Sequence, residues 1–205
     1  DIGQALTQEF GSAAVSTDPS ELVAYGQDWT RYYSPSPSAI LFPSSADVVT
    51  RALHWASAHN VPVVPSGGRT GLSGGAVACS GELVINCSRL NAIGEPDLAA
   101  QTLSVESGAV TAAVHERCAE SGLTWPIDLA SKGSSQIGGN VSTNAGGIRV
   151  IRYGHTRAWV LGLDVALMSG ETLRLGRGLI KDNTGMDPLH LFVGTEGTLG
   201  IVTGA

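Results

Sequence analysis

Two glycine-rich stretches constrain this chain more than any other feature of its sequence. They span residues 65–76 (PSGGRTGLSGGA) and 137–147 (IGGNVSTNAGG), and a shorter segment, EGTLGIVT, spans 196–203. Glycines cluster where a backbone must approach a ligand closely or adopt a positive φ. Consecutive backbone N–H groups in such loops form a concave site for an anion such as a diphosphate. The loops therefore predict a bound nucleotide cofactor.

The charge balance limits how such a cofactor can be held. The chain has 205 residues with 12 basic and 18 acidic side chains, a net charge of −6 and no Lys/Arg cluster. We therefore expect no nucleic-acid partner, because such binding depends on neutralising phosphates. An anionic cofactor would instead be held by backbone amides and helix N-termini.

Cysteine usage bears on the compartment. Cys79, Cys87 and Cys118 form no CxxC pair and are odd in number, which argues against a disulfide framework or a metal site. We expect them to be small core residues in a reducing compartment, the cytoplasm, or the mitochondrial matrix if the source is eukaryotic. No apolar run is long enough to span a membrane, so no transmembrane segment is expected.

Apolar periodicity and turn residues predict alternating strands and helices. A helix should begin near Pro43, with Ser44 or Ser45 as its N-cap, and stop at Asn60. A short helix followed by irregular backbone is expected within 1–38, and further helices cover 111–121, with Gly122 just beyond the end, and 187–193. Strands are expected at 39–42, 61–64, 82–86, 101–107 and 158–168, and the last should return as a hairpin at 171–175.

This order of elements predicts an α+β fold with two packed α/β subdomains. The stretch 89–100 reads as a loop and marks the boundary between them. We therefore expect a lead-in at 1–38, a first subdomain at 39–95 and a second at 96–205.

Two common nucleotide-binding patterns do not fit the loops. A dinucleotide-binding site of the Rossmann type needs G-x-G-x-x-G, whereas the first loop has no G-x-G start. A Walker A loop needs Gly-Lys-Ser/Thr, and that triplet does not occur. One such loop is compatible with ordinary turns, but three in a chain of domain length favour a ligand site.

The loops resemble those of a known family, the FAD-linked oxidases of the vanillyl-alcohol-oxidase type. Within that family, the motifs GGNVSTNAGG at 138–147 and KDNTG at 181–185 resemble those of the D-2-hydroxyglutarate and D-lactate dehydrogenases. One difference is Met186, where those enzymes usually have Tyr. The resemblance covers nearly the whole chain from Ala39 onward. The other matching segments are 65–75, 126–128, 152–154, 160–165 and 194–203.

The resemblance implies a PCMH-type FAD-binding domain whose two subdomains hold the cofactor between them. Arg69 stands where the covalently flavinylated branch carries His, which implies FAD held without a covalent bond. For Arg69 itself a charged contact and a solvated surface position remain open, as do a cofactor contact and a loop-fixing role for Asp128. The residues implied to bind FAD are Pro65, Ser66, Gly67, Gly68, Arg69, Thr70, Gly71, Gly74, Gly75, Pro126, Asp128, Ser134, Gly138, Gly139, Asn140, Thr143, Asn144, Gly147, Tyr153, Gly154, Glu196, Gly200, Ile201 and Val202.

The implied activity is oxidation of a D-2-hydroxy acid (of the D-lactate, D-2-hydroxyglutarate or glycolate class) to the 2-oxo acid. Electrons would then pass to an acceptor such as a quinone, an electron-transfer protein or oxygen. The family's enzymes are about twice as long, so the chain is expected to be the FAD-binding half without the C-terminal substrate domain, and no catalytic residue is assigned. The alternatives are a non-catalytic FAD-carrying module that needs a partner chain, or another enzyme of the same fold.

Overall fold

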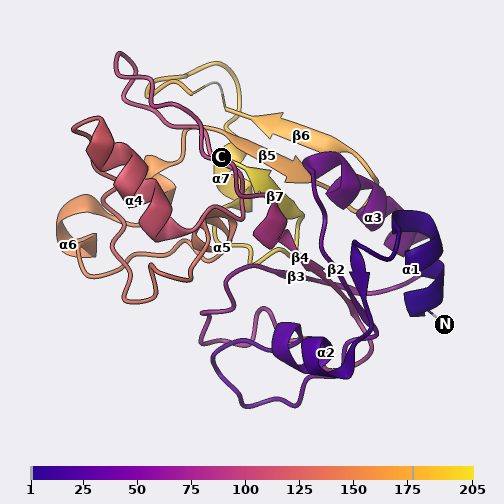
Figure 1. The fold of residues 1–205 in the computed structure, drawn as a ribbon. Coiled ribbons are helices and arrows are strands. Elements are labelled where there is room, and N and C mark those ends of the chain that lie inside the picture. The colour runs from indigo at the N-terminus through magenta and orange to yellow at the C-terminus, as the bar shows by residue number, and fades with distance from the viewer. Residues whose placement is uncertain (1, 177) are drawn as a thin grey trace.

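The chain folds around two β-sheets with helices beside and between them (Figure 1). The computed structural model describes residues 2–176 and 178–205. Helices α4 and α6 lie at the end of the molecule away from the N-terminus (Figure 1). This two-sheet arrangement agrees with the expected α+β class.

The first sheet has the strand order β1-β2-β4-β3. Strand β4 is parallel to β2 and β3, and β1 pairs with β2 in the antiparallel sense. Every residue of β2 and β4 is buried, as is typical of parallel strands covered on both faces. The strands are β1 (Val15–Ser16), β2 (Ala39–Leu41), β3 (Val63–Ser66) and β4 (Leu83–Asn86).

Helix α3 (Ala46–Ala58) packs between the first sheet and the second. Its N-cap is Ser45, whose hydroxyl accepts the backbone N–H of Val48 at 3.3 Å, so the prediction of a Ser cap is confirmed. Its apolar face, Val49, Ala52, Leu53 and Ala56, is buried. This face joins one core cluster with β2, β4 and two residues of the second sheet, Ala166 and Ile201.

The second sheet is antiparallel, with the order β6-β5-β7. Strands β5 (Leu163–Ala166) and β6 (Thr172–Leu175) form the predicted hairpin, and Gly170 in its turn has φ +84°. Strand β7 (Ile201–Gly204) pairs on the other side of β5. The prediction of one long strand over 158–168 is wrong, because the 3-10 helix η2 (Thr156–Trp159) occupies its first part.

The remaining helices are short and mostly peripheral. Helix α4 matches the prediction for 111–121, and Gly122 follows it with φ +69°. The predicted strand at 101–107 is wrong: this segment forms only isolated bridges, such as Ile93 with Val105. The helices are α1 (Ile2–Phe10), α2 (Pro19–Tyr25), η1 (Cys87–Arg89), α4 (Thr111–Glu120), α5 (Ile137–Ser142), α6 (Val150–Tyr153) and α7 (Leu189–Phe192).

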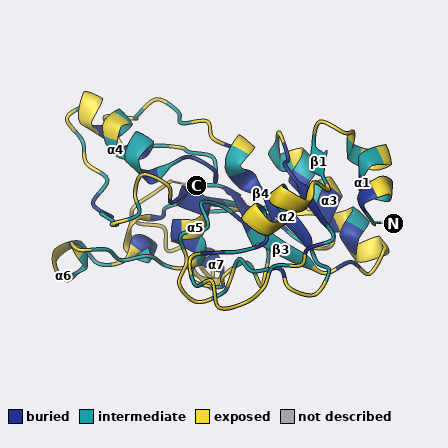
Figure 2. Ribbon diagram, turned by 60° about the horizontal axis from the view of Figure 1, so that its bottom comes forward, coloured by how far each residue is buried: buried dark blue, intermediate teal, exposed yellow. Residues whose placement is uncertain are grey.

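Burial is greatest in β2, β4, β5 and β7, whereas β6 and α6 contain no buried residue (Figure 2). A second core cluster packs α4, α5 and α7 against β5 and β7. Cys87 and Cys118 are buried as expected, but Cys79 is exposed, which corrects its assignment to the core. Burial raises the pKa of the Cys87 thiol to about 11.

The lead-in at 1–38 is more ordered than expected. It contributes α1, α2 and the edge strand β1, so it belongs to the first sheet. The subdomain boundary between 95 and 96 stays a prediction. No helix in the described part of the chain is long and apolar enough to cross a membrane.

Candidate functional site

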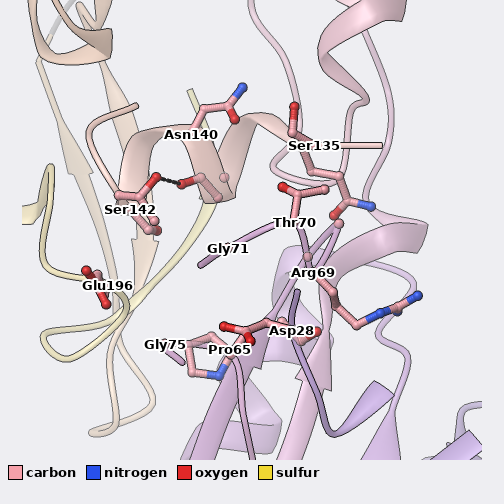
Figure 3. A pocket seen from close by; sticks show the side chains of 18 of the residues that line it. Asp28, Pro65, Arg69, Thr70, Gly71, Gly75, Ser135, Asn140, Ser142 and Glu196 are labelled. Carbon is pink, nitrogen blue, oxygen red and sulfur yellow. Dashed lines mark hydrogen bonds between the residues drawn. The ribbon is translucent and has the colours of Figure 1, made fainter. Parts of the chain in front are cut away.

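A cavity of about 420 Å³ lies where the three glycine-containing segments meet (Figure 3). The first loop follows β3, the second forms α5, and the third leads into β7. Both sheets therefore contribute a wall through the loops at their ends. The volume falls in the range of cofactor and small-ligand sites.

The first loop presents unused backbone donors to this cavity. The N–H groups from Gly68 to Ser73 donate to no acceptor among the described residues. Charged side chains are few in the described lining, namely Asp28, Arg69 and Glu196. Anion binding here must therefore come chiefly from backbone amides, as the charge balance predicted.

Close approach between the first loop and residues 134–136, just before the second loop, explains why glycine is required at 67 and 68. A Cβ on Gly68 would overlap the carbonyl oxygen of Ser134. A Cβ on Gly67 would lie 3.0 Å from Oε1 of Gln136, which is buried without a hydrogen-bond partner in the described structure. A buried acceptor without a partner is costly unless a ligand or water supplies a donor. The open amides, the glycine cradle and this acceptor together fit a nucleotide cofactor that carries both anionic and hydrogen-bond-donating groups.

Asp28 lies beside the first loop, far from it in sequence. Its side chain is only 4% exposed, and it accepts hydrogen bonds from the backbone N–H groups of Thr30 and Gly74, both at 2.9 Å. Sequence reasoning missed this residue, because it placed 1–38 outside the site. The available signal was Asp-Trp-Thr at 28–30, where the Asp side chain accepts from the residue two positions on, as in an Asx-turn.

The second loop differs from the first, because a buried network of polar side chains holds it in place. Nδ2 of Asn140 donates to Oγ1 of Thr111 at 2.7 Å, and that oxygen lies 2.8 Å from Oγ of Ser135. Figure 3 shows the Asn140 amide pointing away from Gly71 on the opposite wall. Asn140 therefore anchors α5 through Thr111.

Arg69 is half-buried, with its guanidinium carbon 4.1 Å from the centre of the Tyr25 ring. This cation–π contact favours an ordered position over a solvated surface position. Glu196, which is exposed on the opposite side, reaches Gly75: a Cβ there would lie 2.7 Å from the Glu196 carboxylate. Both side chains line the cavity.

Asp128 does not line the cavity. Its carboxylate is 2.9 Å from Nζ of Lys132 and 3.4 Å from Nε of Arg149. The hydrogen bond from Lys132 holds the pKa of Asp128 below its usual range, with help from the charges of Lys132 and Arg149. The Asp128 carbonyl also accepts the N–H of Ile148 at 3.0 Å, which supports the loop-fixing interpretation.

The structure brings together most of the residues expected to bind a cofactor and leaves others outside the lining. The expected residues that line the cavity are Pro65, Ser66, Gly67, Gly68, Arg69, Thr70, Gly71, Gly75, Gly138, Gly139, Asn140, Thr143, Glu196, Ile201 and Val202. Those outside the lining are Gly74, Pro126, Asp128, Ser134, Asn144, Gly147, Tyr153, Gly154 and Gly200. Lining residues that sequence reasoning missed are Asp28, Leu72, Ser73, Ala76, Cys87, Ser107, Leu129, Ser131, Ser135, Gln136, Ser142, Ala145 and Gly197.

Comparison with known proteins shows to which family the chain belongs. Residues 37–176 match the family model described as FAD binding domain. The chain is 51% identical over 98% of its length to a D-2-hydroxyglutarate dehydrogenase of Xanthomonas citri pv. viticola, and 51% identical over 93% to one of Stutzerimonas stutzeri. It is 41% identical over 91% of its length to a mitochondrial D-2-hydroxyglutarate dehydrogenase of Danio rerio. The matched parts make up 43%, 41% and 35% of these relatives, so the chain spans less than half of each.

The fold also matches a solved structure. An alkyldihydroxyacetonephosphate synthase superposes on 98% of the chain with a TM-score of 0.84 at 22% identity, and the match covers 39% of that protein. At this identity the likeness concerns the fold, and it confirms the expected PCMH-type architecture. The family model, the relatives and the fold agree that this chain belongs to the FAD-binding domain family of the FAD-linked oxidases, with FAD as its cofactor.

Proposed function

We propose that this chain is the FAD-carrying part of an oxidoreductase that oxidises a D-2-hydroxy acid to the 2-oxo acid. The observation that carries the proposal is the 51% identity, over 98% of the chain, with a D-2-hydroxyglutarate dehydrogenase. The donor-rich cavity supports the cofactor half of the proposal. D-2-hydroxyglutarate is the first substrate to test, followed by D-lactate and glycolate.

The chain's own contribution is to bind and orient the cofactor. When bound, FAD supplies a hydride acceptor for the substrate carbon that bears the hydroxyl. The amides of Gly68–Ser73 would hold the diphosphate, since they have no acceptor among the described residues. Gly67, Gly68 and Gly138 would let the segments that form the cavity pack closely against one another, and Gln136 would accept a hydrogen bond from one of the N–H or O–H groups of FAD. We also propose that the other cavity-lining residues that were expected from the sequence to bind FAD contact the cofactor.

The proposed mode of attachment is non-covalent. Arg69, on the loop position where the covalent branch carries His, is held over Tyr25 and offers no nucleophile. Denaturing the protein should therefore release all its flavin into the supernatant. Flavin that stays with the denatured chain would contradict this part of the proposal.

The proposed partners are a small hydroxy acid and a separate electron acceptor. The relatives from Danio rerio and Arabidopsis thaliana are named as mitochondrial, so we propose the mitochondrial matrix for a eukaryotic source and the cytoplasm for a bacterial one.

The test uses the full-length protein that contains this chain. After purification, bound flavin is measured by its visible absorbance, and each 2-hydroxy acid is added without oxygen. For the two chiral acids, loss of the oxidised flavin absorbance with the D-enantiomer, but not with the L-enantiomer, is the expected result. A protein that binds FAD yet is reduced by none of these acids would overturn the oxidoreductase proposal and leave a flavin-carrying module.

A further inference from the structure

A stretch of backbone from Gly26 to Ser36, called here the strap, runs along the first glycine loop and the residues after it. The N–H of Trp29 donates to the carbonyl of Gly71 at 3.0 Å, and the N–H of Ala78 donates to the carbonyl of Gly26 at 2.9 Å. The N–H of Ser36 donates to the carbonyl of Ala78 at 2.8 Å. The strap precedes residue 37, where the match to the FAD-binding family model begins.

Asp28 is the side chain that connects the strap to the loop. One carboxylate oxygen accepts the N–H and the hydroxyl of Thr30, at 2.9 and 2.6 Å, and the other accepts the N–H of Gly74 at 2.9 Å. Gly74 has φ +83°, so the loop turns sharply at the residue that Asp28 holds. Both carboxylate oxygens thus accept hydrogen bonds within the protein, and Asp28 also lines the cavity.

The charge of Asp28 opposes the binding of an anion in the same cavity. A buried carboxylate also loses hydration, and hydrogen bonds to it must compensate. Any favourable effect of Asp28 on the cofactor must therefore come from the geometry that it imposes on the loop.

We infer that Asp28 is a positioning residue for FAD: by holding Gly74, it keeps the amides of Gly68–Ser73 turned toward the cavity. The inference rests on the proposed use of these amides as the diphosphate site. It makes the strap a part of the cofactor site, although it lies outside the matched family segment. If the Asp28 carboxylate is removed, lost loop geometry should weaken FAD affinity, whereas lost negative charge should strengthen it. The direction of the change in affinity therefore tests the inference.

The experiment titrates FAD into the flavin-depleted full-length protein and follows quenching of flavin fluorescence. Asp28→Ala should weaken FAD affinity about tenfold, the order expected when one buried hydrogen-bond anchor is lost. Asp28→Asn keeps a single acceptor oxygen, so it should bind FAD with an affinity between those of the wild type and Asp28→Ala. The matched control is Asp18→Ala, which removes the exposed N-cap of α2 in the same lead-in and should leave FAD affinity unchanged.

Two further readouts separate positioning from loss of folding or from charge. Titrations are run well below the melting temperature of each flavin-free variant. If Asp28→Ala does not fold, the FAD affinity of Asp28→Asn is the deciding measurement. Affinities are also compared at high salt, where screening weakens the repulsion between the carboxylate and the anionic cofactor, so a loss of affinity that persists there reports positioning. Wild-type or tighter affinity in folded Asp28 variants would overturn the inference, whereas a wild type that binds no FAD would refute the cofactor site itself.

Discussion

The two glycine-rich loops look alike in sequence but are built in different ways. The first loop, 65–76, leaves the amides of Gly68–Ser73 without protein acceptors and is held from outside by Asp28. The second loop begins as helix α5, uses most of its amides internally and is anchored through the buried network at Thr111. In both loops glycine permits close packing, of Gly68 against the Ser134 carbonyl and of Gly138 against Ser107, so the loops differ in their free amides and not in the role of glycine. Glycine content alone therefore does not distinguish an anion cradle from a tight helix–strand contact.

The largest expected effect is from Gly68→Ala in the first loop. The new methyl group would overlap the Ser134 carbonyl, which is backbone and can move only with its loop. We expect a loss of about 3 kcal/mol in the free energy of unfolding from this overpacking, together with a loss of FAD binding that exceeds that of any Asp28 variant. Chemical denaturation and FAD titration measure the two effects.

Gly133→Ala is the matched control for that prediction, because a Cβ there meets nothing within 4 Å. It should be close to neutral in both measurements. If Gly68→Ala is also neutral, the close approach of Gly68 to the Ser134 carbonyl does not constrain the first loop. The interpretation that glycine is required there would then be wrong.

The second prediction compares two neighbouring glycines of α5. A Cβ on Gly138 would lie 2.6 Å from Cβ of Ser107, whereas one on Gly139 meets nothing within 4 Å. Gly138→Ala should destabilise the fold by about 2 kcal/mol. Gly139→Ala should stabilise it by up to about 1 kcal/mol, because Ala favours helix over Gly. Thermal melts of both flavin-free variants measure this difference, and equal melting temperatures would refute a packing role for the second loop.

The third prediction concerns the network that anchors α5. Thr111→Val keeps the side-chain shape but leaves Nδ2 of Asn140 without its acceptor in a buried place. We expect a cost of about 1–2 kcal/mol in unfolding free energy, and little change in FAD affinity once stability is accounted for. Thr50→Val on α3, which removes a hydrogen bond to the Ala46 carbonyl four residues back, is the control and should cost less. A selective loss of FAD affinity in Thr111→Val would instead make this network part of the ligand site.

The smallest expected effect is the pH dependence of the ion pair between Asp128 and Lys132, outside the cavity. Because Lys132 lowers the pKa of Asp128 in the folded chain, the pair stabilises the fold above the unfolded carboxylate pKa of about 3.9. That stabilisation is lost as the pH falls through the lowered folded value. Asp128→Asn should therefore melt below the wild type at neutral pH and converge with it in acid. Melting curves across this range check the prediction, and a difference that persists in strong acid would show that the contact is not electrostatic.

Local sequence signals correctly predicted helix ends and turns, because these features depend on interactions between residues close together in the chain. Ser45 caps α3, Gly122 follows α4, and Ser169-Gly170 turns the hairpin, because each choice depends on a few neighbouring residues. The alternating pattern at 101–107 failed as a regular strand, because its backbone pairs only at single positions with different segments, as Val105 does with Ile93 and Glu106 with Gly204. At 158–168 the apolar run continues through η2, and the run alone could not show where the extended backbone begins.

The sequence by itself determined where the glycine loops lie and how few cationic side chains could hold an anionic cofactor, and the motifs in the loops pointed to FAD. Only the tertiary structure decided which side chains support those loops: Asp28 from the lead-in, Gln136 behind Gly67, and Thr111 beneath α5. It also showed that Asp128 lies outside the cavity, paired with Lys132. The physical reason is that backbone conformation depends on residues adjacent in the chain. The partner of a buried polar group, by contrast, depends on which distant segments the two cores bring together.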